Sequence, residues 1–527
     1  MQQQLSLVEY GSRRVIITIT AILCALLEIV DTTIVNVALN DMKGNLGATM
    51  TEVGWVITAY AIGNVIIVPM TSWLSQQFGR RNYFAASIML FTVCSFLCGN
   101  ANGIWELVVF RFLQGVGGGA LLVTSQTIIT ESYPPEKRGM AQAIYGLGVI
   151  IGPTLGPPLG GYIVDNFSWP YIFYINIPIG IIAALLTLQF VRSPKYSEKS
   201  LAKDIDWIGI GLLALAVGSL QYVLEKGHDD DWFNSTTIII LSFTAVFGLF
   251  FFVWRELTFR NPIVELRVLK NGNLRIGTLL SFILGFGLYG STFIIPLYTQ
   301  STLGWTAQQS GALMIPAALT TAFMMPLIGQ MLQKGVPQQY LIGGGMLLFF
   351  IYSFWGYKIL TPDTGKDAFF WMLMVRGVAM GMLFIPITTL SLSTLKGQQI
   401  GQGASFTGMM RQLGGSFGVA TITTFLASQN MVYRNNIISH LDVNNPVVQQ
   451  RVQGMQNNFI AKGMAPDNAL SSSYKSLEYM VAKQAAILSY MDVFLYIGLM
   501  FLICIPLVLF VRRKKAAGKI DLSEAMH

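Results

Sequence analysis

The chain has 527 residues, of which 53% are hydrophobic and only 11% are charged, and its formal net charge is +8. A soluble protein carries about 25% charged residues, so this composition excludes an ordinary soluble domain and indicates a chain solvated mainly by lipid. The basic residues are scattered over short loops instead of forming one patch, which argues against nucleic acid as a partner.

Fourteen apolar stretches, each long enough to cross a bilayer as a helix, make up most of the sequence. Backbone polar groups in lipid must be satisfied within their own segment, and these runs are continuous rather than alternating. We therefore predict an all-α polytopic membrane protein. The predicted spans are 15–39, 52–73, 83–101, 105–130, 139–162, 169–191, 206–224, 236–254, 275–299, 309–331, 339–359, 368–392, 403–427 and 489–511.

Lys and Arg are distributed unequally between the two sides of these spans. With the N-terminus inside, 22 of the 34 basic residues fall in inner loops, whereas the short outer loops hold only Lys43, Lys226, Lys358 and Lys366. Cytoplasmic loops carry the excess of Lys and Arg in membrane proteins. The asymmetry predicts an even number of spans and two cytoplasmic termini.

The segment 428–488 is the only sizeable part of the chain predicted to lie outside the membrane. Its amphipathic stretches, such as SLEYMVAKQAAIL, predict short helices on the outer face. Three interpretations stay open, namely docking of a partner, gating of an exit, and a tolerated insertion.

The first span carries two carboxylates, Glu28 and Asp31, within AILCALLEIVDTTIVNVAL. A charge at this depth costs roughly 3 kcal/mol or more, so such residues usually serve a function. Helix geometry places Asp31 roughly 12 Å below the outer end of the span, with Glu28 one turn deeper on the same face. Two carboxylates close together at low dielectric are expected to hold a proton between them, which predicts proton coupling. A structural ion pair between Asp31 and Arg111 is the alternative.

Further polar residues lie inside other spans. Arg111 is expected about 10 Å below the outer end of its span, where it could contact Asp31 or reach the membrane interface. Arg411 has three interpretations, namely binding a substrate anion, locking the bundle, or reaching the interface. Asn36, Gln126 and Gln412 are candidates for hydrogen bonding in a substrate cavity.

Several chemistries find no support in the sequence. No GxxxxGK[ST] loop is present, which argues against energy from ATP hydrolysis. The three histidines, His228, His440 and His527, all lie outside the predicted spans. We therefore expect no metal, no cofactor and no enzyme activity.

One predicted span has a regular stripe of glycines at Gly148, Gly152, Gly156 and Gly160. Small residues at this spacing let helices approach closely, while Pro153, Pro157 and Pro158 remove backbone donors and bend the helix. A close-packed, bendable helix at the seam between two halves of the protein would suit conformational gating. Plain close packing is the alternative.

An internal repeat is visible in the sequence. PMTSWLSQQFGRRNY (69–83) matches PLIGQMLQKGVPQQY (326–340), and RFLQGVGGGALLVTSQTII (111–129) resembles RGVAMGMLFIPITTLSLST (376–394). The offset of eight spans predicts two six-helix bundles, 1–200 and 263–527, separated by two inserted helices in 201–262. The second bundle would include the long periplasmic loop at 428–488. Parallel repeats of this kind place a substrate site between the halves near the midplane.

Several motifs resemble those of a known family. LEIVDTTIVNVAL, RFLQGVGGG, GLGVIIGPTLGPPLGG, WPYIFYINIPIG and RQLGGSFG are similar to motifs of the major facilitator superfamily, in its fourteen-span drug:proton antiporter branch of the EmrB/QacA type. One loop departs from the superfamily pattern GxLaDRxGRR, because Gln76 and Gln77 replace its Asp and Arg. Gly79, Arg80 and Arg81 remain and are expected to take part in gating.

The resemblance implies a function. It implies a proton-driven multidrug efflux antiporter that exports lipophilic or cationic toxic compounds across the bacterial inner membrane by alternating access. It also implies a role for Arg111 in proton transfer, and a possible periplasmic adaptor of the EmrA type with an outer-membrane channel. The alternatives are a solute:proton symporter of the same fold and, less favoured, a membrane-embedded protein that does not transport.

Overall fold

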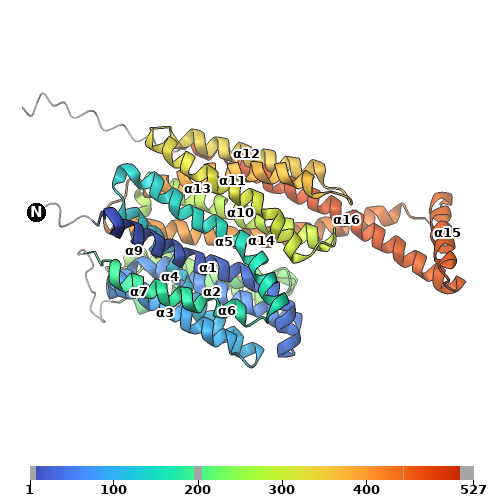
Figure 1. Cartoon of the computed structure of the whole chain (residues 1–527), viewed down its shortest axis with the longest axis horizontal. Helices are drawn as coiled ribbons and strands as arrows, with labels where there is room; N and C mark the ends of the chain where they lie inside the picture. Colours follow the sequence, from blue (N-terminus) through green and yellow to red (C-terminus); the bar gives the residue numbers. More distant parts are fainter. Residues whose placement is uncertain (1–6, 195–204, 443, 511–527) are drawn as a thin grey trace, which may run out of the picture.

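The computed structural model describes residues 7–194, 205–442 and 444–510. Helices hold most of these residues and none of them lies in a β-strand, which confirms the all-α prediction. The helices form an elongated bundle with the N-terminus at one end and α15 at the other, called the α15 end below (Figure 1). The α-helices are α1 (Gly11–Leu46), α2 (Met50–Phe78), α3 (Arg80–Gly99), α4 (Ile104–Ser132), α5 (Arg138–Asn166), α6 (Tyr171–Tyr174), α7 (Asn176–Phe190), α8 (Trp207–Lys226), α9 (Thr236–Thr258), α10 (Gly272–Ser301), α11 (Ala307–Gln333), α12 (Gln338–Ile359), α13 (Lys366–Leu392), α14 (Gln398–Ser439), α15 (Pro446–Ala461) and α16 (Pro466–Cys504).

Within the described ranges, thirteen helices are long and apolar enough to cross a membrane. They match thirteen of the predicted spans, with α6 and α7 together forming one of them. The predicted span 403–427 lies in α14, which is richer in Gly, Gln and Ser and packs against α2, α4, α10 and α16. A helix surrounded by other helices can cross a membrane without an apolar surface, which explains why this span is less apolar than the others. The count of fourteen spans stays a prediction.

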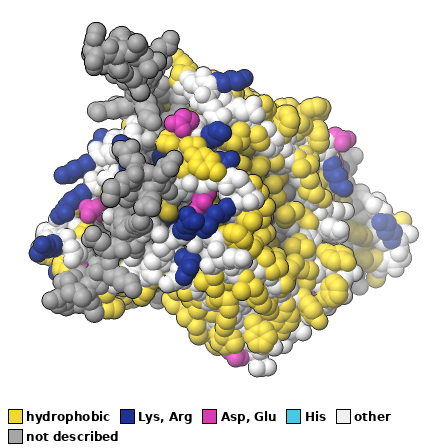
Figure 2. Space-filling model, turned by 60° about the vertical axis from the view of Figure 1, so that its left-hand side comes forward, with side chains coloured by type: hydrophobic (Ala, Val, Ile, Leu, Met, Phe, Trp, Pro, Cys, Tyr) yellow, Lys and Arg dark blue, Asp and Glu magenta, His cyan; other side chains and the backbone are white. Residues whose placement is uncertain are grey.

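The surface agrees with a membrane environment. Hydrophobic side chains cover a broad flank of the bundle, while Lys and Arg gather toward the N-terminal end (Figure 2). Part of this apolar surface belongs to α9, where Phe243, Phe247 and Trp254 are exposed. Several of the basic residues that set the predicted orientation lie in 195–204 and 511–527, outside the described residues.

Two groups of helices pack internally and meet along a seam. In the first group α1 packs on α5, α2 on α4, and α3 on α4 and α7; in the second α10 packs on α14, α11 and α12 on α13, and α12 on α16. The groups meet where α5 contacts α11 and where α14 contacts α2 and α4, and we call this interface the seam. The pair α8–α9 reaches both groups, because α8 contacts α2 and α14. The proposed limits of the domains remain predictions, and residue 200 lies outside the described residues.

The segment 428–488 differs from the expected loop with short helices. It consists mainly of the continuations of α14 and α16 beyond the bundle, joined through α15 (Figure 1). Neither Gly nor Pro interrupts the sequence between Val419 and Asn445, so nothing in it ends the helix where the membrane would. Contacts between the two continuations include an ion pair of 3.0 Å between Arg434 and Glu478.

The glycine stripe of α5 faces α1 and not the seam. A Cβ atom at Gly152 would lie 2.5 Å from Ile29 Cγ2, and one at Gly160 would lie 2.8 Å from Ile34 Cγ1. The seam side of α5 carries different residues: Gly146 faces Met325 and Phe384, and Pro158 faces Gly311 on α11. The helix lies at the seam as expected, but its stripe joins α5 to α1, while Pro153, Pro157 and Pro158 lie within the continuous helix.

Substituting Gly156 with alanine is expected to destabilise the protein by about 1–3 kcal/mol, the usual cost of overpacking. The new Cβ would lie 2.8 Å from Thr33 Cβ and 3.2 Å from Ile34 N, so α1 and α5 would have to separate. Gly161→Ala is the matched control, because nothing lies within 4 Å of a Cβ at this position of the same helix. Thermal unfolding in detergent measures both; equal melting temperatures would show that the α1–α5 contact is not tight.

Candidate functional site

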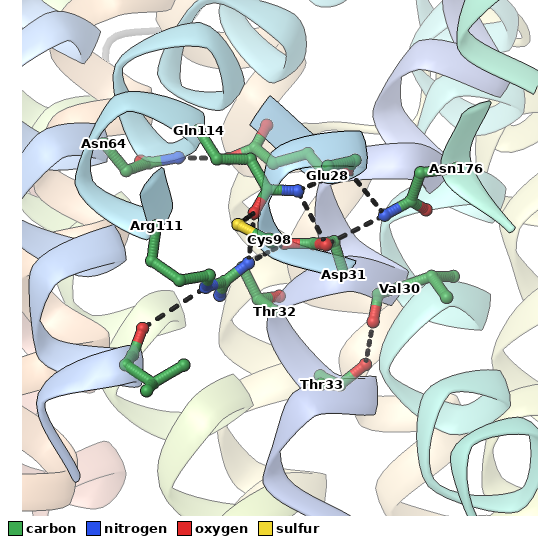
Figure 3. Close-up of polar contacts among 12 residues, drawn as sticks. Glu28, Val30, Asp31, Thr32, Thr33, Asn64, Cys98, Arg111, Gln114 and Asn176 are labelled. Carbon is green, nitrogen blue, oxygen red and sulfur yellow. Dashed lines mark hydrogen bonds and ion pairs between the residues drawn. The ribbon is translucent and has the colours of Figure 1, made fainter. Parts of the chain in front are cut away.

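Asp31 lies at the centre of a buried hydrogen-bond network inside the first helix group (Figure 3). Its Oδ2 atom lies 2.5 Å from Arg111 Nη1 of α4. Its Oδ1 atom accepts hydrogen bonds from Gln114 Nε2 at 3.0 Å and from Asn176 Nδ2 of α7 at 2.9 Å. Asp31 is 0% exposed and Arg111 only 1% exposed. The contact that depth alone allowed is therefore present, and it involves α1, α4 and α7.

The Arg111 side chain is buried among several partners inside the first helix group and does not extend to its surface. Its Nη1 also donates to Gln114 Oε1 at 2.7 Å, and its Nε donates to the carbonyl of Val56 at 3.3 Å. The guanidinium lies over the ring of Tyr60, 4.2 Å from the centroid. Removing one partner of an ion pair this deeply buried typically lowers the stability of the folded protein by about 3–5 kcal/mol. The geometry fits both a structural ion pair and a group that responds to protonation.

Glu28 has a different set of partners and lies nearer the seam. Its Oε1 accepts a hydrogen bond from Asn64 Nδ2 of α2 at 2.7 Å, and its Oε2 accepts one from the backbone N–H of Leu122 at 3.1 Å. The side chain is buried, like that of Asp31. The two carboxylates are thus hydrogen bonded to different donors, although they occupy the same helix at i and i+3.

Arg411 brings a positive charge from α14 to the seam. Its guanidinium lies 5.3 Å from the ring centroid of Phe384, and the Phe384 ring lies 6.5 Å from the ring of Tyr145 of the other helix group. The residue is buried, and among the described residues its Nη1 atom has no hydrogen-bond partner. Glu28 is linked to Tyr145 through Leu122, whose backbone N–H donates to Glu28 Oε2 and whose carbonyl accepts from Tyr145 Oη. We call Glu28, Tyr145, Phe384 and Arg411 the seam cluster.

The other candidate cavity residues are placed unevenly. Gln126 is buried on α4, where its Nε2 donates to Gln142 Oε1 of α5 at 3.2 Å and its Oε1 has no partner among the described residues. Gln412 is partly buried on α14. Asn36 is exposed and donates to the carbonyl of Thr32 in its own helix at 3.4 Å.

The residues expected to gate lie at the N-terminal end of the bundle. Gly79 has φ +80° and joins α2 directly to α3, a conformation that favours glycine. Arg80 is buried and forms a two-bond ion pair with Glu131 of α4, with distances of 2.5 and 3.1 Å. The backbone N–H of Arg81 donates to Ser193 Oγ at 3.1 Å.

Gln76, which departs from the superfamily pattern, crosses the seam. Its Oε1 accepts a hydrogen bond from Gln398 Nε2 at the start of α14, at 2.5 Å. Where the superfamily pattern has an acidic residue, this chain thus makes a neutral contact between the two helix groups.

Three residues of the site were not singled out by sequence reasoning. Gln114 and Asn176 bind Asp31, and Asn64 binds Glu28. Gln114 stands three residues after Arg111 and Asn176 stands in WPYIFYINIPIG, so both occur in motifs that were noticed for their resemblance. Each of the three is a polar residue within a predicted apolar span, and this feature of the sequence could have identified them as candidates for the site.

Arg376 occupies the place in the second helix group that the sequence repeat pairs with Arg111. It donates to Ser291 Oγ at 2.8 Å and to Thr292 Oγ1 at 2.7 Å, both on α10. Hydroxyls thus stand where the first group has the carboxylate of Asp31. In the described part of the chain, no group of three or more His, Cys, Asp or Glu could hold a metal ion.

Comparison with known proteins agrees with this architecture. The profile of the Major Facilitator Superfamily matches residues 21–419. The chain is 32% identical to the multidrug export protein EmrB of Escherichia coli (strain K12), over 98% of this chain and 99% of that protein. It is 33% identical to the fatty acid resistance protein FarB of Neisseria gonorrhoeae, over 93% and 95% of the two chains. The solved proton:xylose symporter XylE superposes with a TM-score of 0.58 at 15% identity, covering 94% of this chain and 96% of that one, which shows a shared fold.

The fold and the buried polar site define a multi-pass membrane transporter built from two packed helix groups. The chain belongs to the Major Facilitator Superfamily. Its similarity to EmrB-type export proteins extends over almost its whole length.

Proposed function

We propose that this protein is a proton-driven multidrug antiporter that exports lipophilic or cationic toxic compounds by alternating access. The observation that carries the proposal is the pair of buried acidic residues in α1, one bound to Arg111 and the other bonded to Asn64 and to the backbone of Leu122. Buried ionisable groups inside a membrane bundle mark ion and substrate pathways in most transporters. The export activity named for the relative EmrB supports the same direction of transport.

The proposed mechanism assigns different tasks to the two carboxylates. Asp31 exchanges a proton, because a protonated Asp31 would release Arg111 from its ion pair. Glu28 and Arg411 lie at the seam, where we place the path of the substrate, and Arg411 Nη1 is a donor available to an acceptor atom of the cargo. The residues Gly79, Arg80 and Arg81 take part in gating at the N-terminal end, while the α5 glycines pack α5 closely on α1 so that the first helix group moves as one unit.

We further propose an inner-membrane location with both termini in the cytoplasm, based on the distribution of Lys and Arg. The N-terminal end of the bundle is then the inner end and the α15 end the outer one. The continuations of α14 and α16 carry exposed apolar residues such as Met431, Val432 and Tyr479. They are the place where a periplasmic adaptor of the EmrA type, leading to an outer-membrane channel, would bind.

Transport in inside-out vesicles tests the function. Respiration acidifies the vesicle lumen, and addition of ethidium, a lipophilic cation, should dissipate the proton gradient as the dye accumulates inside. Vesicles without the protein are the control. A proton gradient that survives the addition of this dye and of a panel of other lipophilic drugs would exclude the antiporter. A solute:proton symporter would also leave the proton gradient intact, because the substrate is added outside the vesicles while the protons are concentrated in the lumen.

A further inference from the structure

The pair of inserted helices contacts both helix groups near the outer end of the seam. The α8–α9 hairpin (residues 207–258) reaches the rest of the protein mainly through α8, since α9 is largely exposed. We propose that this hairpin is a strap over the outer end of the α2–α14 seam, and that it must release α14 before substrate can leave. The inference rests on the alternating-access function proposed above.

The attachment of the strap to α2 is extensive. The ring centroids of Tyr222 and Trp55 lie 5.4 Å apart. The ammonium group of Lys226 is buried against Gly54, since its Nζ would lie 2.8 Å from a Cβ at this glycine. Deeper in the bundle, Gly218 faces the side chain of Ile66 at 3.5 Å. The contacts between α8 and α2 thus include packed rings, the buried Lys226 side chain and apolar groups, and they extend over several helical turns. We therefore expect α8 to move together with α2.

The attachment to α14 at the outer end depends on two hydrogen bonds. Gln221 Nε2 donates to Ser416 Oγ at 2.8 Å, and Trp232 Nε1 donates to Thr424 Oγ1 at 3.0 Å. One hydrogen bond of this kind changes an equilibrium constant by roughly 2- to 12-fold. Two of them are strong enough to bias a gate toward its closed form and weak enough to open during each cycle.

The turn that presents Trp232 is held in an unusual conformation. Asp231 and Trp232 have φ values of +56° and +49°, in the left-handed region that residues other than glycine rarely occupy. The Trp232 ring packs on Gly227, where a Cβ would lie 2.5 Å from its Cζ3, and Trp232 N donates to the Gly227 carbonyl at 2.7 Å. Lys226 and Asp229 form an ion pair of 3.2 Å beside it. Strain of this kind persists only where surrounding contacts fix the backbone, and here it positions the indole N–H toward α14.

The test measures opening of the seam from outside, without any drug. The background lacks the four native cysteines, Cys24, Cys94, Cys98 and Cys504, and carries Gln412→Cys, one turn deeper than Ser416 on α14. The probe is a membrane-impermeant maleimide, and the readout is its labelling rate in intact cells. Trp232→Phe and Thr424→Val should each raise this rate roughly 2- to 12-fold, the value of one hydrogen bond. The double variant should raise it no further, because both changes remove the same bond.

Trp254→Phe is the matched control, since Trp254 lies exposed on α9 of the same hairpin. The strap is wrong if Trp232→Phe and Thr424→Val leave the labelling rate unchanged, if their effects add, or if Trp254→Phe has the same effect. This result is independent of the proposed function. Drug–proton exchange is measured on the unaltered protein. If the unaltered protein exchanges drug for protons while labelling is unchanged, the strap alone is refuted, whereas faster labelling together with no exchange by the unaltered protein refutes the antiporter alone.

Discussion

Replacing Asp31 with asparagine is expected to abolish proton-driven drug exchange. The amide has no proton to exchange in the working pH range, and it leaves the Arg111 guanidinium buried without a counter-charge. Removing one partner from a buried ion pair typically costs about 3–5 kcal/mol, so the single variant should also be less stable. Exchange is measured in energised inside-out vesicles, and stability by thermal unfolding in detergent.

A second variant separates coupling from folding. Asp31→Asn combined with Arg111→Gln removes both charges and leaves neutral groups that can hydrogen bond to Gln114 and Asn176. We expect this double variant to recover much of the lost stability and still to lack proton-driven exchange. Asp41→Asn, an exposed position on the same helix, is the control and should behave like the unaltered protein. If the double variant still exchanges drug for protons, Asp31 is a structural residue and the coupling site lies elsewhere.

The fold could be read from the sequence because lipid imposes a simple rule. A segment in a bilayer must satisfy its own backbone, so long apolar runs become helices whatever they pack against. The same rule could not predict the full length of α14 and α16. An apolar run marks only the part of a helix inside the membrane, and both helices continue beyond it. Pro466 occupies the first helical position of α16 and marks where that helix begins, whereas α14 ends at Ser439, before Pro446 begins α15.

The site was predictable in its composition but not in its partners. Depth along a helix placed Asp31 and Arg111 at one level, and the structure shows them in contact. The position of a residue along a helix does not say which neighbouring helix its side chain faces. The sequence therefore predicted neither the separate donors of Glu28 nor which helix the α5 glycines contact. The glycine stripe predicted a close contact correctly but did not say which helix would fill it.

Replacing Arg411 with methionine is expected to lower drug transport strongly without unfolding the protein. Its Nη1 has no partner among the described residues, so the closed form loses no hydrogen bond from that atom. A buried charge whose donors are not all hydrogen bonded carries a desolvation cost, which methionine, an apolar residue of similar length, does not carry. A substrate contact to a charged donor contributes about 1.5–3 kcal/mol, so the apparent affinity for a substrate that binds there should fall roughly 10- to 150-fold.

Arg376→Met is the matched control, because Arg376 is a buried arginine in the repeat position on α13 that binds hydroxyls of its own helix group. It should change the apparent KM for drug far less than Arg411→Met does. Both variants are compared for drug-induced proton release across a concentration series and for melting temperature. If Arg411→Met unfolds the protein while Arg376→Met does not, Arg411 fastens the two helix groups together. If Arg411→Met is stable and its KM is unchanged, cargo passes the seam without touching this residue.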